Sequence, residues 1–149
     1  MKILDLSAGN RAIWFDRNYR DAVYLDIREE VSPSVVGDST KLPTEVGDGF
    51  DLIVFDPPHA NYGANGRMTK NYGHFTLPEI RATISGSAKE AHRVARVDAL
   101  MAFKWHNHDL KLDTVLALLS PYWEPLFGHG VAPSQRRDKM TSWVMLRRR

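Results

Sequence analysis

The stretch Phe50–His59, with the sequence FDLIVFDPPH, carries the residues best suited to chemistry. Its run of apolar, β-favouring residues ends in Asp56, and neither a continuing strand nor a helix interior tolerates the two prolines that follow. A strand therefore ends at Phe55 or Asp56. The prolines lack backbone N–H groups, so their carbonyl groups and the Asp56 carboxylate form a corner rich in hydrogen-bond acceptors. Such a corner suits an amine; the alternative interpretation is a plain turn that ends a strand.

Three other short apolar runs also carry an acid at or near their ends. In an open parallel sheet the carboxyl ends of the strands meet at one edge, where ligands bind. Four acids at four strand ends therefore predict a shared binding site more specifically than any one of them. The runs are Lys2–Leu6 with Asp5, Ala22–Ile27 with Asp26, Val35–Ser39 with Asp38, and Phe50–Phe55 followed by Asp56.

The first of these runs leads into a turn of small residues, Ser7 to Asn10, and then into a predicted helix start at Arg11–Phe15. Such a turn lets backbone N–H groups approach a ligand closely. With one glycine, it does not match the dinucleotide-binding fingerprint. Asp26 lies 21 positions after Asp5, close to the spacing at which an acid meets ribose hydroxyl groups in nucleotide-binding sheets.

The motif Asp56-Pro57-Pro58, followed by the ring of His59, resembles the catalytic motif of S-adenosylmethionine-dependent amino-methyltransferases. Those enzymes methylate exocyclic amines of adenine or cytosine in nucleic acids. In the family, the acid and the first proline's carbonyl group accept hydrogen bonds from the target NH2 group, and an aromatic residue stacks on the base. His59 stands where the family usually has Tyr, Phe or Trp, which leaves the stacking partner and the target base open.

The first loop, Asp5-Leu6-Ser7-Ala8-Gly9-Asn10, resembles the first motif of class I methyltransferases, which cradles the methionine part of the cofactor. The same resemblance implies that Asp26 binds ribose hydroxyl groups and that Asp38 binds the adenine amino group. Asp26 could instead be a solvated acid, and Arg28 could either reach the cofactor or pair with a neighbouring glutamate. The expected binding residues for S-adenosylmethionine are Asp5, Leu6, Ser7, Ala8, Gly9, Asn10, Asp26, Arg28, Asp38 and Ser39.

The length of 149 residues predicts one domain. We expect it to be α/β, with residues 1–56 as the cofactor-binding half and residues 57–149 as the catalytic and substrate half. The resemblance implies a sheet that is doubly wound, mostly parallel and seven-stranded, in the order 3-2-1-4-5-7-6 with the last strand antiparallel. The intervals after Ile27 and after Ser39 are too short for crossover helices, which need about ten residues or more with their loops. The later elements expected are a helix capped by Thr76 and ending near Val94, a strand Ala99–Trp105, a helix Leu110–Leu119, and closing strands Trp123–Val131 and Ser142–Leu146.

Charge is divided between the two halves of the chain. Residues 1–56 hold 6 basic and 11 acidic side chains, whereas residues 57–149 hold 14 and 7. Basic clusters in the second half are typical of phosphate-backbone binding, although a basic terminus alone is often a solubilising tail. Residues 60–76 have no apolar period and predict a loop whose rings and cations suit base stacking and phosphate contact. The expected substrate-binding residues are Tyr62, Arg67, Lys70, Tyr72, Lys104, Arg136 and Arg137.

Several classes of site are not expected. The chain has no cysteine, which excludes disulfides and thiolate metal sites. No apolar run approaches the roughly 20 residues of a membrane span, and Met1 leads directly into a strand without a signal peptide, so we expect a cytoplasmic protein with no membrane partner. His106, His108 and Asp109 lack a clear further ligand, so we expect no metal.

The expected function is methyl transfer to an exocyclic amine of a DNA or RNA base, with adenine N6 favoured over cytosine N4. Two alternatives remain: a methyltransferase acting on a protein amide or a small amine, and a degenerate module that binds the cofactor without turnover. A chain of 149 residues has little room for a recognition domain. Sequence specificity is therefore expected to be weak or to come from a second subunit, in a homodimer or with a different partner.

Overall fold

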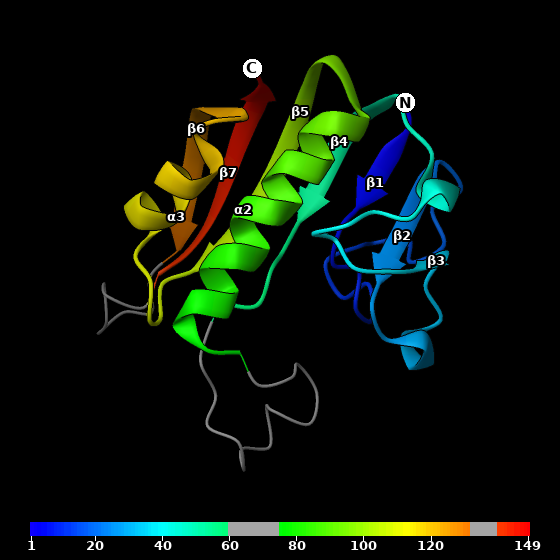
Figure 1. The fold of residues 1–149 in the computed structure, drawn as a ribbon, viewed down its shortest axis with the longest axis horizontal. Coiled ribbons are helices and arrows are strands. Elements are labelled where there is room, and N and C mark those ends of the chain that lie inside the picture. The colour runs from blue at the N-terminus through cyan, green and yellow to red at the C-terminus, as the bar shows by residue number, and fades with distance from the viewer. Residues whose placement is uncertain (60–74, 132–139) are drawn as a thin grey trace.

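Seven strands form one sheet in the order β3-β2-β1-β4-β5-β7-β6 (Figure 1). The computed structural model describes residues 1–59, 75–131 and 140–149. Strand β7 is antiparallel to both of its neighbours, and the other neighbouring pairs are parallel. The predicted strand order and antiparallel last strand are confirmed. The strands are β1 (Ile3–Asp5), β2 (Ala22–Asp26), β3 (Val35–Val36), β4 (Phe50–Phe55), β5 (Ala95–His106), β6 (Trp123–Val131) and β7 (Thr141–Arg148).

The early crossovers contain single 3-10 turns in place of α-helices, as the short intervals predicted. Between β2 and β3 lies η1 (Glu29–Val31), and between β3 and β4 lies η2 (Thr44–Val46). Strand β3 is shorter than predicted and ends at Val36. Asp38 therefore lies in a turn, where its carboxylate accepts hydrogen bonds from the Thr40 backbone and hydroxyl groups.

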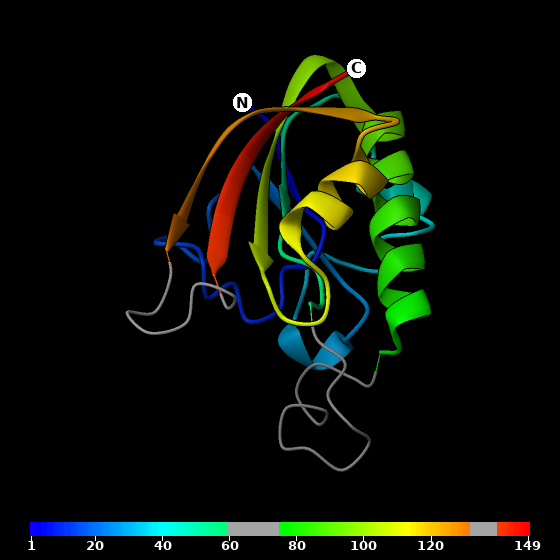
Figure 2. The same ribbon diagram turned by 90° about the vertical axis from the view of Figure 1, so that its left-hand side faces the viewer.

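Two α-helices, α2 (Leu77–Val94) and α3 (Leu112–Leu119), lie on the same face of the sheet (Figure 2). The predicted cap of α2 is present: the Thr76 hydroxyl accepts a hydrogen bond from the Glu79 backbone, and the Glu79 carboxylate accepts one from the Thr76 backbone. Ile80 and Ile84 of α2 are fully buried in the core beneath the helix. Within the described residues, no helix is long and apolar enough to cross a membrane.

The segment after β1 forms turns, so the helix start predicted at Arg11–Phe15 is wrong. Arg11 has a φ of 55°, which a right-handed helix does not allow. Its guanidinium group lies over the Tyr24 ring and donates hydrogen bonds to the Arg17 and Ser32 carbonyl groups. The Trp14 ring meets the Tyr24 ring edge-on at 5.2 Å between centroids. These side-chain contacts hold the turns against β2 and replace the hydrogen bonds of a helix.

Strand β5 is longer than predicted, because it begins at Ala95, directly after α2. Asp98 has a φ of 62°, and the pairing with β4 shifts register between Phe50 and Leu52. The extra residues therefore form an irregular start before regular pairing begins. The strand ends at His106, which leaves Lys104 and His106 at the same edge of the sheet as Asp56.

Candidate active site

Asp5, at the carboxyl end of β1, is 1% exposed. One carboxylate oxygen accepts a hydrogen bond from the Ser7 backbone at 3.2 Å, and the other accepts one from the Trp14 indole at 2.7 Å. Burial raises the pKa of Asp5 to about 6, although the hydrogen bonds from Trp14 and Ser7 oppose this shift. Asp5 thus fixes the loop that follows β1 and has a pKa close to neutral pH.

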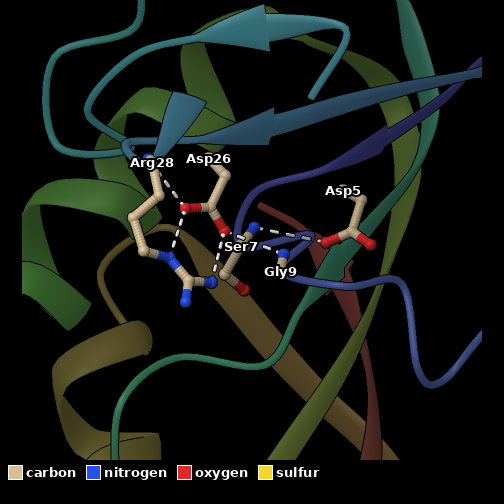
Figure 3. Close-up of polar contacts among 5 residues, drawn as sticks. All are labelled: Asp5, Ser7, Gly9, Asp26 and Arg28. Atoms are coloured by element: carbon tan, nitrogen blue, oxygen red, sulfur yellow. Dashed lines mark hydrogen bonds and ion pairs between the residues drawn. The ribbon is translucent and has the colours of Figure 1, made fainter. Parts of the chain in front are cut away.

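Asp26, at the end of β2, binds the same loop from the neighbouring strand (Figure 3). One oxygen accepts hydrogen bonds from the backbone and the Nε of Arg28, both at 3.0 Å. The other accepts from the Gly9 backbone at 2.8 Å and from an Arg28 terminal nitrogen at 3.2 Å. Burial alone would raise the pKa of Asp26, but the hydrogen bonds from Arg28 and Gly9 outweigh it and lower the pKa. Arg28 thus pairs with Asp26. The sequence had suggested that Arg28 would either reach the cofactor or pair with Glu29 or Glu30.

The backbone of the loop after β1 has a conformation that lets a ligand approach it closely. Gly9 has a φ of +50°, and a Cβ added there would lie 3.4 Å from a terminal nitrogen of Arg28. Leu6 and Ala8 are buried and donate backbone hydrogen bonds to Val54 and Leu25, so the loop is tied to both neighbouring strands. Asn10 is exposed at its end. Ser39, also expected to bind the cofactor, instead shares a hydrogen bond with Ser87 of α2 at 2.7 Å between their hydroxyl oxygens.

Asp56 directly follows β4 and contacts the first loop. Its backbone N–H group donates to the Ser7 hydroxyl at 3.0 Å. Its carboxylate accepts from the Lys104 ammonium group on β5 at 2.7 Å. Pro57 is buried, whereas Pro58 and His59 are half-buried. The structure therefore brings Asp56, the loop of β1 and the predicted substrate residue Lys104 into one place.

A pocket of about 320 Å³ opens beside this group. The His59 ring meets the rings of Trp105 and His106 edge-on, at 6.2 and 5.3 Å between centroids. Burial lowers the pKa of His59; Asp56 opposes this effect, and nearby His106 and Lys104 add to it. His59 is therefore a neutral ring at neutral pH. The pocket is lined by Asp56, His59, Lys104, His106, His108 and Thr141.

The sequence assigned no role to three of these lining residues. His106 ends β5 and His108 follows it, so the sequence placed both beside the site, on condition that this strand lies next to β4. Thr141 begins β7 and its hydroxyl lies 2.8 Å from the Nδ1 of His106. Nothing local in the sequence places it beside β5, because the contact depends on the pairing of β5 with β7.

Six predicted substrate-binding residues lie outside the described part of the chain: Tyr62, Arg67, Lys70, Tyr72, Arg136 and Arg137. Within the ranges 1–59, 75–131 and 140–149, no group of three or more histidine or acidic side chains is arranged to hold a metal ion.

Comparison with solved structures gives neighbours that include several methyltransferases. No protein-family model and no curated protein matches the chain. The N-methyltransferase NodS from Bradyrhizobium japonicum WM9, solved with S-adenosylhomocysteine, has a TM-score of 0.67 at 12% identity, over 99% of this chain and 77% of that one. The chain has the class I methyltransferase fold.

Two further structural neighbours have the same fold. An rRNA methylase from Streptococcus thermophilus has a TM-score of 0.61 at 13% identity, over 98% of this chain and 85% of that one. SMU.1697c, a putative methyltransferase from Streptococcus mutans solved with S-adenosylhomocysteine, has a TM-score of 0.61 at 14% identity, over 99% and 88%. At such identities the likeness establishes the fold alone.

Proposed function

We propose that this chain transfers the methyl group of S-adenosylmethionine to an exocyclic amine of a nucleic-acid base, with adenine N6 favoured over cytosine N4. The observation that carries the proposal is the hydrogen bond between the Asp56 backbone and the Ser7 hydroxyl group. It joins the Asp-Pro-Pro corner to the loop that would hold the cofactor. A methyl donor on that loop and an amine at Asp56 would then be neighbours.

The residues at the ends of β1 and β2 fit the cofactor in chemistry. Asp26 presents a carboxylate whose two oxygens suit the two hydroxyl groups of a ribose. Gly9, held at positive φ, allows the backbone of the loop to come close to the methionine part. Asp38 and Ser39 are proposed for the adenine end. Because the two oxygens of Asp26 already accept four hydrogen bonds, a bound ribose must replace at least one of them.

S-adenosylmethionine supplies a methyl group on a sulfonium, which is already a strong electrophile. The chain therefore has mainly to position the amine and to exclude water. The amine would donate hydrogen bonds to Asp56 and to the Pro57 carbonyl group, which directs its lone pair toward the methyl group. Lys104 holds one Asp56 oxygen at 2.7 Å, so the amine would share this carboxylate with the ammonium group.

The nucleic-acid part of the proposal is supported by the basic second half of the chain. One neighbour of the same fold is the rRNA methylase from Streptococcus thermophilus, so the fold accommodates an enzyme that acts on RNA. DNA and RNA both fit the chemistry at Asp56, because the target amine is the same in each.

The experiment is methyl transfer from S-adenosylmethionine labelled on its methyl group to mixed DNA and RNA, followed by digestion to nucleosides. The expected result is label in an N6-methyladenine nucleoside. Label in N4-methylcytosine would support the proposed reaction but identify cytosine as the target base. Binding of S-adenosylmethionine with no label in any nucleic acid would overturn the proposal and favour either another amine substrate or a module without turnover.

A further inference from the structure

The sheet face opposite α2 and α3 carries the exposed apolar side chains of Trp143 on β7 and Phe127 on β6, beside the half-buried Met145 and Ala102. Directly paired residues of neighbouring strands point to the same face. The register therefore places Ala102, Met145 and Phe127 in one row across the three strands. The next row holds Lys104, Trp143 and His129. We call these six residues the open-face patch.

The patch is exposed where a sheet of this kind would normally be covered. Along β7, Val144 and Leu146 are buried under the helices, whereas Trp143 between its buried neighbours is 38% exposed. Phe127 on β6 is 70% exposed. Figure 2 shows both described helices on the other face. A contiguous group of exposed large apolar side chains marks an interaction surface.

The charges around the patch favour a protein partner over a polyanion. Lys104 pairs with Asp56 at 2.7 Å, and Arg147, on the same face, pairs with Glu124 at 2.8 Å. Each of these cations is thus balanced by an acid, so the face offers little net charge to phosphates. A centre of Trp, Phe and Met with its charges at the border is the composition of a protein interface core.

The same face is complementary to a second copy of itself. Glu124 and Arg147 lie directly opposite each other on β6 and β7. A two-fold axis can set the Arg147 of one copy against the Glu124 of the other, and the reverse contact follows by symmetry. Two sheets can pack in this way about 10 Å apart with their inner side chains interdigitated.

The size of the face suits a weak dimer. With strands about 4.8 Å apart and a rise of about 3.4 Å per residue, the area over β5, β7 and β6 along β7 is roughly 400 Å² per copy. Both copies together then bury about 800 Å², the size of a weak, transient interface that forms at high protein concentration. From this geometry we propose that the chain forms a homodimer through the open-face patch. Lys104 belongs both to the patch and to the pocket beside Asp56, but the mass of the assembly can be measured without any methyl transfer.

The test is the molecular mass in sedimentation velocity up to about 100 μM protein, where mass action favours association. The variants are Phe127→Lys in the patch and Val97→Lys at the amino end of β5, whose wild-type side chains are 70% and 72% exposed. Wild type and Val97→Lys should sediment at twice the 17.0 kDa of one chain, and Phe127→Lys at that single mass. Trp143→Ser is a second variant that should disrupt the dimer. Circular dichroism verifies that each variant folds.

A wild-type protein that stays a monomer up to this concentration would overturn the proposal. So would a folded Phe127→Lys variant that remains a dimer. A monomer that binds single-stranded DNA, and binds it less well after Phe127→Lys, would also overturn it and assign the face to nucleic acid.

Discussion

Four hydrogen bonds meet on the carboxylate of Asp26, and they show what residue types alone can and cannot predict. The spacing from Asp5 pointed to Asp26 as a ligand-binding acid. The ion pair with Arg28 was not anticipated, because a residue two positions away on a strand end has several possible partners. The choice between them depends on the shape of the loop around Gly9, which is set by contacts distant in the sequence.

Asp26→Asn should weaken the binding of S-adenosylmethionine by about 10- to 100-fold, because a hydrogen bond to a charged group contributes about 1.5–3 kcal/mol. Isothermal titration calorimetry measures this change. The matched control is Asp21→Asn, just before the same strand, where the side chain is exposed and pairs with Arg20. The control should bind as the wild type does. Equal affinities for wild type and Asp26→Asn would remove Asp26 from the cofactor site.

Asp5 should make the stability of the fold depend on pH. Its pKa is about 6 in the folded protein against 3.8 as the ordinary value, so the folded state holds this proton more tightly. The stabilisation is fully present below about pH 3.8 and is lost as pH rises through about 6. A shift of this size corresponds to at most about 3 kcal/mol.

Urea unfolding of wild type and Asp5→Asn at two pH values tests this expectation. The free energy of unfolding of the wild type, relative to the variant, should be higher near pH 4.5 than near pH 7.5 by about 1–3 kcal/mol. Other titrating groups largely cancel in this difference. A difference that is the same at both pH values would contradict the raised pKa of Asp5.

At the scale of elements, the loop after β1 is the part most dependent on backbone conformation. Gly9→Ala should lower the free energy of unfolding by about 1 kcal/mol, because alanine is strained at positive φ. Gly49→Ala is the matched control: Gly49 has a φ of +75°, and a Cβ there would meet no atom within 4 Å. Both variants should lose similar stability in urea unfolding. Gly9→Ala alone should also weaken S-adenosylmethionine binding in calorimetry; equal binding by the two variants would exclude the loop from the cofactor site.

Most elements could be predicted from local signals, and their order in the sheet from the family resemblance. The Thr76 capping box, the short crossovers and the strand order inferred from the resemblance all match the structure. Elements were missed where long-range contacts override local preference. Arg11 and Trp14 hold turns through Tyr24 and Asp5 in place of a helix, and β5 begins early because Ala95 pairs with Phe50. The pocket residue Thr141 depends on strand pairing in the same way.

At the scale of the whole molecule, the division of charge bears on the substrate. Residues 1–56 are net acidic and residues 57–149 net basic. Displacement of counterions from phosphates should make nucleic-acid affinity fall by about 10- to 100-fold between 50 and 200 mM salt, as for about two to four phosphate contacts. Fluorescence anisotropy with a labelled oligonucleotide measures this slope. Methyl-acceptor binding that is insensitive to salt would instead favour a protein amide or a small amine.

The most direct test of the central claim is single-turnover methyl transfer to nucleic acid by wild type, Asp56→Ala and Asp51→Ala. Asp51 is the matched control, since it lies on β4, which Asp56 directly follows, and pairs with Arg96 away from the pocket. Asp56→Ala should transfer at least about 100-fold more slowly, as when one preorganised polar contact to the reacting group is lost. Its affinity for S-adenosylmethionine should stay within about threefold of wild type, since Asp56 is assigned to the amine. Asp51→Ala should transfer at the wild-type rate. Equal rates for wild type and Asp56→Ala would contradict the assignment of Asp56 as the acceptor of the target amine.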